Sequence, residues 1–147
     1  MHIRNYTPTD KAFLLEILQL NIPQYFAESE LHDLENYLEH EIEQYFVAEI
    51  ENEIVGAGGI NFDWANQTGK ISWDFINPKF QKMGIGKALL DHRIYILQTT
   101  EGIKHITVRT SQLAYQFYEK NGFQLQNIIK DYWAKGFDLY EMQYKND

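Results

Sequence analysis

The sequence feature that most constrains the fold is a segment with two glycines, Gln81-Lys82-Met83-Gly84-Ile85-Gly86, between a predicted strand and a predicted helix. Residues 71–76 alternate apolar and polar side chains, as a strand does, and Asn77-Pro78 interrupts that pattern. From residue 88 to residue 97 the apolar residues recur with helical spacing. The two glycines are therefore predicted to occupy a strand-to-helix turn.

Such a turn favours the binding of a phosphate group. Glycine lets a ligand approach the backbone, and the first amides of a helix are unpaired and carry the positive end of the helix dipole. Lys82 and Lys87 add cations on either side. A Walker loop would need Ser or Thr at Ala88, and a dinucleotide fingerprint would need glycine at Leu89, so neither motif fits. A tight turn or an ordinary helix start without a ligand is the alternative interpretation.

Two segments of the sequence resemble the GNAT superfamily of N-acetyltransferases. Residues 81–86 are similar to its Q/R-x-x-G-x-G/A loop, in which backbone amides hold the pyrophosphate of acetyl-coenzyme A (acetyl-CoA). Residues 105–123 are similar to the next block of that family, which is a strand, a short polar turn and a helix ending in Y-x-x-x-G-F. With Asn77-Pro78 before the loop, the matching pattern covers about residues 70–123 in the family's order.

The resemblance implies the fold and the co-substrate. It implies one N-acetyltransferase domain over residues 1–147, with an α/β fold of about six or seven strands in a mixed sheet and about four flanking helices. Two central strands would splay apart to admit the pantetheine arm of acetyl-CoA. Homodimers are frequent among relatives, so a homodimer is a further expectation. The implied cofactor contacts are the backbone of Ile76, the loop residues Gln81, Lys82, Met83, Gly84, Ile85, Gly86 and Lys87, and Ser111 in place of the family's usual asparagine.

The resemblance also implies a catalytic acid. Tyr118 stands four residues before Gly122, where the family carries the tyrosine that protonates the leaving thiolate of coenzyme A. A phenol with a pKa of about 10 can protonate a thiolate of similar basicity without being ionised at neutral pH. The alternative is a tyrosine that only packs under the sheet.

The catalytic base is less well defined by the sequence. The family's glutamate would fall near Lys70 or Thr107, and neither residue is a carboxylate. Asp74 is nominated instead, because it is predicted on the strand face of Ser72 and Ile76 that meets the substrate. A solvated aspartate or a helix cap is the alternative role for Asp74.

Composition and charge exclude several classes of function. The sequence has no cysteine, so disulfides, thiolate metal sites and cysteine nucleophiles are excluded. The net charge is −8, and residues 1–69 carry 2 basic against 13 acidic residues, which would repel nucleic acid and attract a cation. No apolar run approaches the roughly 18 residues of a membrane span, and the first residues lack the pattern of a signal peptide. We therefore expect a cytoplasmic protein without nucleic-acid or membrane partners.

The rest of the chain predicts an alternation of strands and helices. The glycines of residues 53–62 predict a bulge, a close approach by another backbone or a ligand, or bending of a central strand. His32 and its neighbouring carboxylates predict a solvated helix face rather than a metal site, and we expect no metal. Strands are expected over residues 2–6, 45–50, 53–62, 71–76, 105–109, 124–133 and 138–144, and helices over 10–22, 28–43, 87–99 and 111–120, with Phe13, Leu14, Ile17, Leu18 and Leu20 as the apolar set of the first helix.

The acceptor is predicted only by class. The expected acceptor is a primary amine, either a small cationic amine or a peptide or protein amine, that attacks acetyl-CoA directly in a ternary complex. The alternatives are an acyl-CoA-binding sensor without turnover, because no carboxylate base is evident, and an unrelated nucleotide-binding protein. The prediction rests on acidic and aromatic wall residues in the first half of the chain, namely Tyr25, Phe26, Glu28, Glu30, Tyr37 and Trp64.

Overall fold

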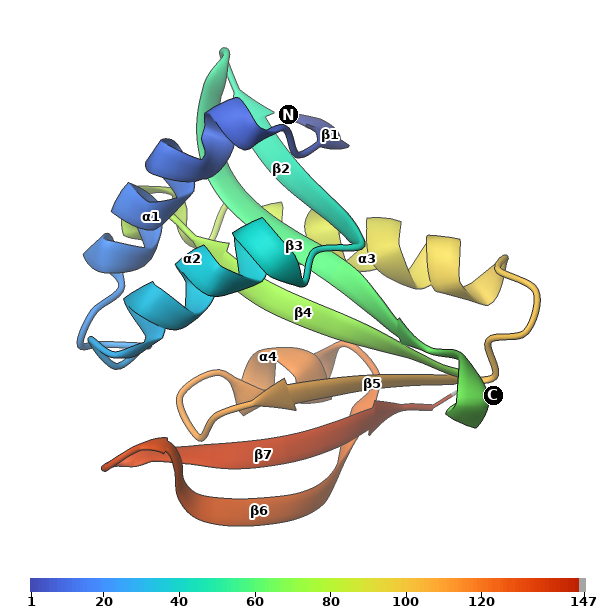
Figure 1. Cartoon of the computed structure of the whole chain (residues 1–147). Coiled ribbons are helices and arrows are strands. Elements are labelled where there is room, and N and C mark those ends of the chain that lie inside the picture. Colours follow the sequence, from blue (N-terminus) through green and yellow to red (C-terminus); the bar gives the residue numbers. More distant parts are fainter. Residues whose placement is uncertain (146–147) are drawn as a thin grey trace.

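A computed structural model of the chain describes residues 1–145 (Figure 1). In this part of the chain seven strands form one mixed sheet, and four helices flank it, so the predicted fold class is confirmed. The strands are β1 (His2–Asn5), β2 (Gln44–Ile50), β3 (Glu53–Asp63), β4 (Thr68–Ile76), β5 (His105–Thr110), β6 (Phe123–Ala134) and β7 (Phe137–Tyr144), and the helices are α1 (Lys11–Leu20), α2 (Glu30–His40), α3 (Ile85–Gln98) and α4 (Tyr115–Lys120).

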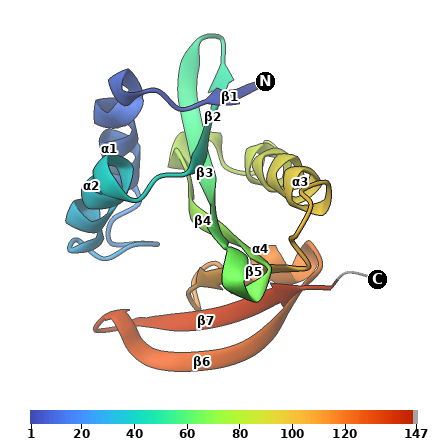
Figure 2. The same ribbon diagram turned by 45° about the vertical axis from the view of Figure 1, so that its right-hand side comes forward.

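The helices cover both faces of the sheet. Figure 2 shows α1 and α2 on one side of β2, β3 and β4, and α3 on the other side. The α1 and α2 side buries Leu14, Leu18 and Leu34 with Val47 of β2. The apolar set predicted for the first helix is wrong at its ends, because Phe13 and Leu20 are 57 % and 55 % exposed. Both side chains fall outside the stripe that faces the sheet.

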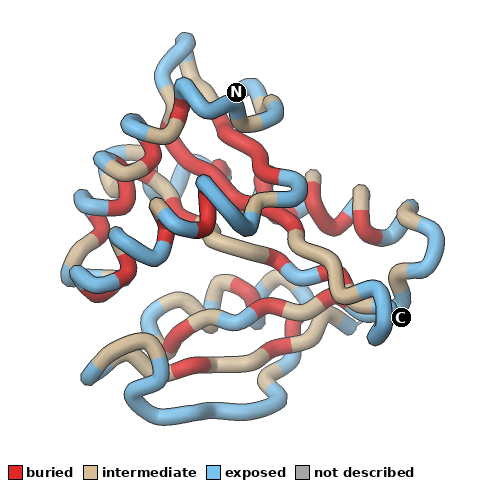
Figure 3. Tube along the Cα trace, in the orientation of Figure 1, coloured by how far each residue is buried: buried red, intermediate tan, exposed pale blue. Residues whose placement is uncertain are grey.

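A second core lies between α3 and the opposite face of the sheet. Leu89, Leu90, Ile94 and Leu97 of α3 are buried there against strand residues such as Ile71. In Figure 3 the middle of β3 is coloured as buried and α3 alternates between buried and exposed residues, whereas much of β6 is exposed along its length. The two cores hold β2, β3 and β4 between two helical layers.

The strand order is β1-β2-β3-β4-β5-β7-β6, and β4 with β5 is the parallel pair. This pair extends from Thr68 opposite His105 to Ile71 opposite Val108, and in the described residues no pairing joins the two strands beyond Ile71. Figure 1 shows β4 and β5 meeting at one end and diverging toward the other. The predicted splay of two central strands is therefore present.

A bulge accompanies the splay. The register between β3 and β4 shifts between Ala57 and Gly59, and Trp73 on β4 has a φ angle of 49°, in the left-handed region. A bulge bends its strand and increases the local twist. It therefore directs the end of β4 away from β5.

The glycines of β3 permit close approaches by side chains, which the sequence did not predict, and at Gly59 by the carbonyl oxygen of Gln44, 2.8 Å from a built Cβ atom, which is the predicted approach of another backbone. A Cβ atom on Gly58 would lie 2.2 Å from Asp74 Oδ1 and 2.7 Å from Arg93 Cζ. A Cβ atom on Gly59 would lie 2.3 Å from Cδ1 of Tyr45. Bulges are also present in the pairing of β3 with both neighbouring strands.

Two predicted helices are shorter in the structure. The helix expected over residues 28–43 is α2, and the one expected over residues 111–120 is α4, which begins at Tyr115. The amide of Tyr115 donates to the carbonyl of Ser111 (3.0 Å), which closes a turn before the helix. Within residues 1–145 no helix is both long enough and apolar enough to cross a membrane.

Candidate active site

The glycine loop joins β4 to α3, as predicted. Lys82 and Gly84 have φ angles of 65° and 79°, and a Cβ atom added to Gly84 would meet no atom within 4 Å. Among the described residues no group accepts a hydrogen bond from the amides of Lys82, Met83 or Gly84. The first amides of α3, from Ile85 onward, have no partner within the helix either. The loop therefore combines open space with bare amides, which is the arrangement that an anion requires.

A cleft of about 1330 Å³ extends from this loop between β4 and β5. Its walls include β4 residues on one side and Thr107 to Thr110 of β5 on the other, so it follows the splay of the strands. Met83 does not line the cleft, and its side chain is 57 % exposed. The cleft brings together the other predicted cofactor residues, namely Ile76, Gln81, Lys82, Gly84, Ile85, Gly86, Lys87 and Ser111.

The polar groups of three of these residues already have partners. The ammonium group of Lys87 pairs with Asp91 one helical turn later (2.7 Å) at an exposed position. The carbonyl of Ile76 accepts a hydrogen bond from Asn21 Nδ2 (3.1 Å), and Ser111 Oγ accepts one from the amide of Leu113 (3.2 Å). A ligand at this end of the cleft therefore meets groups that the fold holds in fixed positions.

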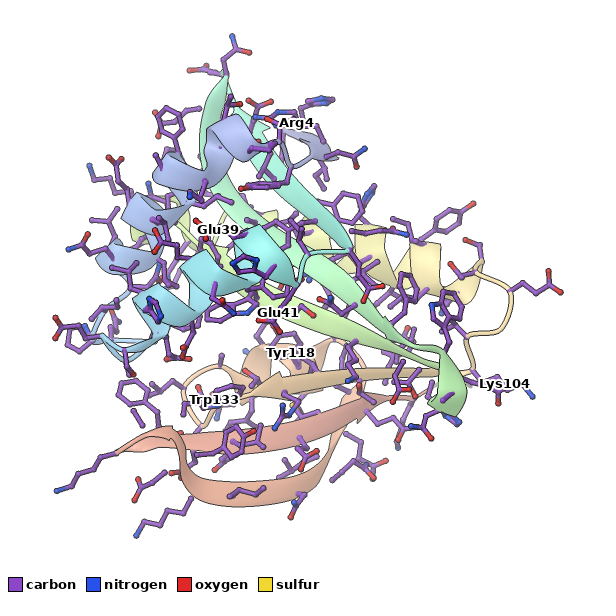
Figure 4. The ribbon with its side chains drawn as sticks, viewed as in Figure 1. Arg4, Glu39, Glu41, Lys104, Tyr118 and Trp133 are labelled. Atoms are coloured by element: carbon purple, nitrogen blue, oxygen red, sulfur yellow. The ribbon has the colours of Figure 1, made fainter. Side chains whose placement is uncertain are left out.

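Tyr118 lies at the inner wall of the cleft. It is 4 % exposed, its ring packs against Phe117 and Phe123 with centroid distances of 5.1 and 5.6 Å, and its hydroxyl group donates a hydrogen bond to Asp74 Oδ2. Figure 4 shows Tyr118 between Glu41 on the α2 side and Trp133 on the hairpin side. The ring is part of the core, as the packing interpretation expects, and Tyr118 also lines the cleft. Its role as the catalytic acid stays a prediction.

Oδ1 of Asp74 also forms an ion pair with Nη2 of Arg93 on α3. This ion pair lacks the alignment of a hydrogen bond. The residue Arg93 is 0 % exposed. Its Nε donates to the carbonyl of Leu89 (3.0 Å) and its Nη1 to the carbonyl of Gly59 (3.1 Å). Sequence reasoning missed Arg93. Its position in the apolar row of α3, between Leu90 and Leu97, was the available signal.

The prediction that Asp74 shares a strand face with Ser72 is wrong. Ser72 lies beside the hydroxyl group of Tyr37 on α2, whereas Asp74 contacts side chains of α3 and α4. Trp73 stacks on Phe26, with ring centroids 6.3 Å apart, on the side of α2. The bulge at Trp73 adds one residue to the strand, which breaks the alternation on which the prediction depended.

Burial dominates the protonation of this cluster. It raises the pKa of Tyr118 well above its usual value, and the negative charge of Asp74 and the hydrogen bond to it raise that pKa further. Burial also raises the pKa of Asp74, and the charge of Arg93 opposes that effect. The Tyr118 hydroxyl group therefore keeps its proton at neutral pH.

The far end of the cleft is aromatic and acidic, as predicted. Glu30 is 6 % exposed, accepts a hydrogen bond from the amide of Ala27 (2.8 Å), and has a pKa raised by burial. Glu28 does not line the cleft, and Trp64 instead stacks on Phe62, so these two predicted wall residues are wrong. The wall consists of Tyr25, Phe26, Glu30 and Tyr37, as expected, with Glu41, Glu43, Trp73, Trp133 and Phe137, which the sequence reasoning missed.

Trp133 connects the β6–β7 hairpin to this wall. Its indole Nε1 donates to the carbonyl of Thr110 at the end of β5 (3.1 Å). In the part of the chain that the structure describes, no three His, Asp or Glu side chains are grouped as metal ligands.

The chain fits acetyl-CoA at this site. The bare amides beside Gly84 suit a pyrophosphate group, and the strand edges left unpaired beyond Ile71 suit an extended pantetheine arm. The same cleft is lined by residues of the loop, by Tyr118 and by the acidic wall. One cavity can therefore hold two substrates end to end.

Comparisons with known proteins agree with this geometry. Residues 12–123 match the model of the acetyltransferase (GNAT) family. An N-alpha-acetyltransferase of Sulfurisphaera tokodaii is 27 % identical over 157 residues, which cover 95 % of this chain and 90 % of that protein.

Solved structures share the fold at low identity. An aminoglycoside 6′-N-acetyltransferase complexed with coenzyme A superposes with a TM-score of 0.78 at 16 % identity, over 100 % of both chains. The ribosomal-protein-alanine N-acetyltransferase of Brucella melitensis superposes with a TM-score of 0.75 at 20 % identity, over 99 % of this chain and 100 % of that chain.

The chain belongs to the acetyltransferase (GNAT) family, as its resemblance predicted. It is an acetyl-CoA-dependent N-acetyltransferase, and acetyl-CoA is its co-substrate.

Proposed function

We propose that this enzyme transfers the acetyl group of acetyl-CoA directly to a primary amine held at the acidic and aromatic wall. The observation that carries the proposal is the position of the Tyr118 hydroxyl group, at the cleft wall between the glycine loop and that acidic end. A thioester anchored at the loop and an amine entering from the wall would meet beside it.

Two acceptor classes suit the wall, a small cationic amine and a peptide or protein amine. The carboxylates of Glu30, Glu41 and Glu43 favour a positively charged acceptor, and the rings of Phe26 and Trp73 add cation–π and apolar contacts. The relative in Sulfurisphaera tokodaii, named an N-alpha-acetyltransferase, supports the peptide class. A peptide substrate would present its α-amine at the open end of the cleft.

The chemistry requires four changes. The amine nitrogen forms a bond to the thioester carbonyl carbon, the carbon–sulfur bond breaks, and its electron pair passes to sulfur. Tyr118 gives its hydroxyl proton to the sulfur, and Asp74 accepts the proton that the amine loses. A backbone amide next to the acetyl carbonyl would stabilise the developing charge on the carbonyl oxygen. Direct attack in a ternary complex needs no covalent enzyme intermediate.

The test is release of free thiol from acetyl-CoA with a panel of amines. The panel comprises a peptide with a free amino terminus, the same peptide with a blocked terminus and one lysine, spermidine and an aminoglycoside. We expect turnover with at least one member. No thiol release above the blank with any of them would contradict the proposal.

The Tyr118→Phe variant tests the role of the hydroxyl group. We expect its kcat to fall by roughly 100-fold, because general acid catalysis contributes on that scale, with little change in affinity for acetyl-CoA. Tyr115→Phe is the matched control, since Tyr115 is on the same helix but packs against Tyr140 outside the cleft. An unchanged kcat in Tyr118→Phe would remove the role.

A further inference from the structure

The cluster of Arg93, Asp74 and Tyr118 contains more than the proposed acid and base. A buried arginine in an apolar helix face is costly unless it is paired, and here its carboxylate partner also accepts the Tyr118 hydrogen bond. The three side chains come from α3, β4 and α4, so the fold brings them together from distant parts of the sequence. Two packed aliphatic side chains would fill the same space without any ion pair.

We propose that Arg93 is a positioning residue for a proton relay, in which Asp74 and Tyr118 act as one unit and Arg93 fixes the carboxylate that connects them. This inference rests on the proposed function, because it assumes that Tyr118 is the acid. Asp74 would take the proton from the amine while the Tyr118 hydroxyl group turns its hydrogen from Asp74 to the sulfur and gives it up. Protonated Asp74 then donates to the Tyr118 oxygen and passes the proton on, which reverses the hydrogen bond of the resting site. One proton enters at Asp74 and one leaves at Tyr118, so the relay ends in its starting state.

The geometry supports this coupling. Each Asp74 oxygen has a different partner, Oδ2 with Tyr118 and Oδ1 with Arg93, and the side chain still has 19 % of its surface exposed. The carboxylate is therefore fixed by the protein, and because Oδ1 is buried, a proton from the cleft would reach it at Oδ2. Gly58 leaves the space for this arrangement, because a Cβ atom there would lie 2.2 Å from Oδ1.

Arg93 also supplies the charge that the relay needs. A phenolate beside a carboxylate is strongly disfavoured, and the charge of Asp74 raises the pKa of Tyr118 accordingly. Arg93 lowers the pKa of both groups. The other titratable groups near this cluster are Tyr45, whose hydroxyl donates to the carbonyl of Trp73 (2.8 Å), Tyr37, and His92 beside Arg93 on α3. Both tyrosines have raised pKa values, and burial and the charge of Arg93 lower the pKa of His92. All three groups are therefore neutral at neutral pH, so Arg93 is the cation that balances the relay.

The relay predicts opposite changes in the pH profiles of two variants. In Arg93→Met the carboxylate loses its cation, so its pKa rises further, and the acidic limb of kcat moves to higher pH. In Asp74→Asn the Tyr118 hydroxyl group loses its anionic neighbour, so its pKa falls, and an alkaline limb appears at lower pH. Arg93→Lys keeps the charge and is expected to restore part of the wild-type profile.

The experiment measures kcat from pH 5 to pH 10, at saturating acetyl-CoA and acceptor, for the wild type and the three variants. The titration of the acceptor amine is common to all of them, so differences report the enzyme groups. At neutral pH we expect Asp74→Asn and Arg93→Met to lose about 10-fold to 100-fold in kcat.

A lower kcat with an unshifted profile in Arg93→Met would reduce Arg93 to a structural role and overturn the inference. If Arg93→Met does not fold, Asp74→Asn alone decides, and the absence of an alkaline shift overturns the relay. Full activity of Tyr118→Phe would instead refute the proposed function itself. The two failures are therefore distinguishable.

Discussion

Replacement of Arg93 by methionine tests the energetic basis of the buried cluster. The side chain is fully buried and binds two backbone carbonyls and one carboxylate. Methionine keeps most of the volume, so packing changes little, but Asp74 is left as a buried carboxylate without a cation. Removal of one partner of a buried pair costs about 3–5 kcal/mol. Since a domain has a free energy of unfolding of about 5–15 kcal/mol, the loss is large.

The assay is urea unfolding followed by tryptophan fluorescence and circular dichroism. We expect Arg93→Met to lower the free energy of unfolding by about 4 kcal/mol and the melting temperature by roughly 10 °C. The double variant Asp74→Asn/Arg93→Met should be more stable than Arg93→Met alone, because it lacks the unpaired charge. Lys130→Met, at an exposed position, is the control and should change stability by about 1 kcal/mol or less. A double variant no more stable than Arg93→Met would refute the electrostatic reasoning.

Two further substitutions test the loop and the ion pair between Arg4 and Asp10. Gly84→Ala should weaken acetyl-CoA binding measured by calorimetry, because the φ of 79° at this position is strained for alanine. Gly136→Ala is the control, since its φ of 83° in the β6–β7 turn should cause similar strain without loss of affinity for acetyl-CoA. Equal losses of affinity in the two variants would contradict the role of the loop. Asp10→Asn tests acid stability, since the hydrogen bond from Arg4 lowers the pKa of Asp10 and the wild type should lose this stabilisation as pH falls below about 4. Unfolding measured from pH 5 to pH 2 should show a flatter dependence in the variant, and parallel curves would rule out Asp10 as the source.

The sequence predicted the parts of the structure that depend on local patterns. Alternating and helical spacings gave the order of strands and helices, and Gly84 and Gly86 gave the turn, because periodicity and backbone freedom are readable from neighbouring residues. The family resemblance supplied Tyr118 and its helix, and the structure shows that this helix lies next to the loop, where Phe117 is 3.4 Å from a Cβ atom built on Gly86.

The cluster at the centre of the site was not readable in this way. Trp73 adopts a positive φ angle that its residue type does not indicate, so the extra residue on β4 and the face of Asp74 could not be predicted. The pairing of Asp74 with Arg93 depends on a contact between residues far apart in the sequence. A cation in the apolar row of α3 shows that a buried anion is needed, but not which one. The wall residue Trp133 likewise reaches the cleft only through the β6–β7 hairpin.

The most direct test of the account is the amide spectrum of the ¹⁵N-labelled protein during titration with acetyl-CoA. In the proposed binding mode the pyrophosphate lies on the loop and the thioester arm lies between the splayed strands. The largest changes in amide chemical shift are therefore expected at residues 82–87, at the end of β4 and at residues 109–111, with smaller changes in β1 and β2. Shifts confined to the polar hollow around His105 and Gln143, or none in the loop at saturation, would contradict this binding mode.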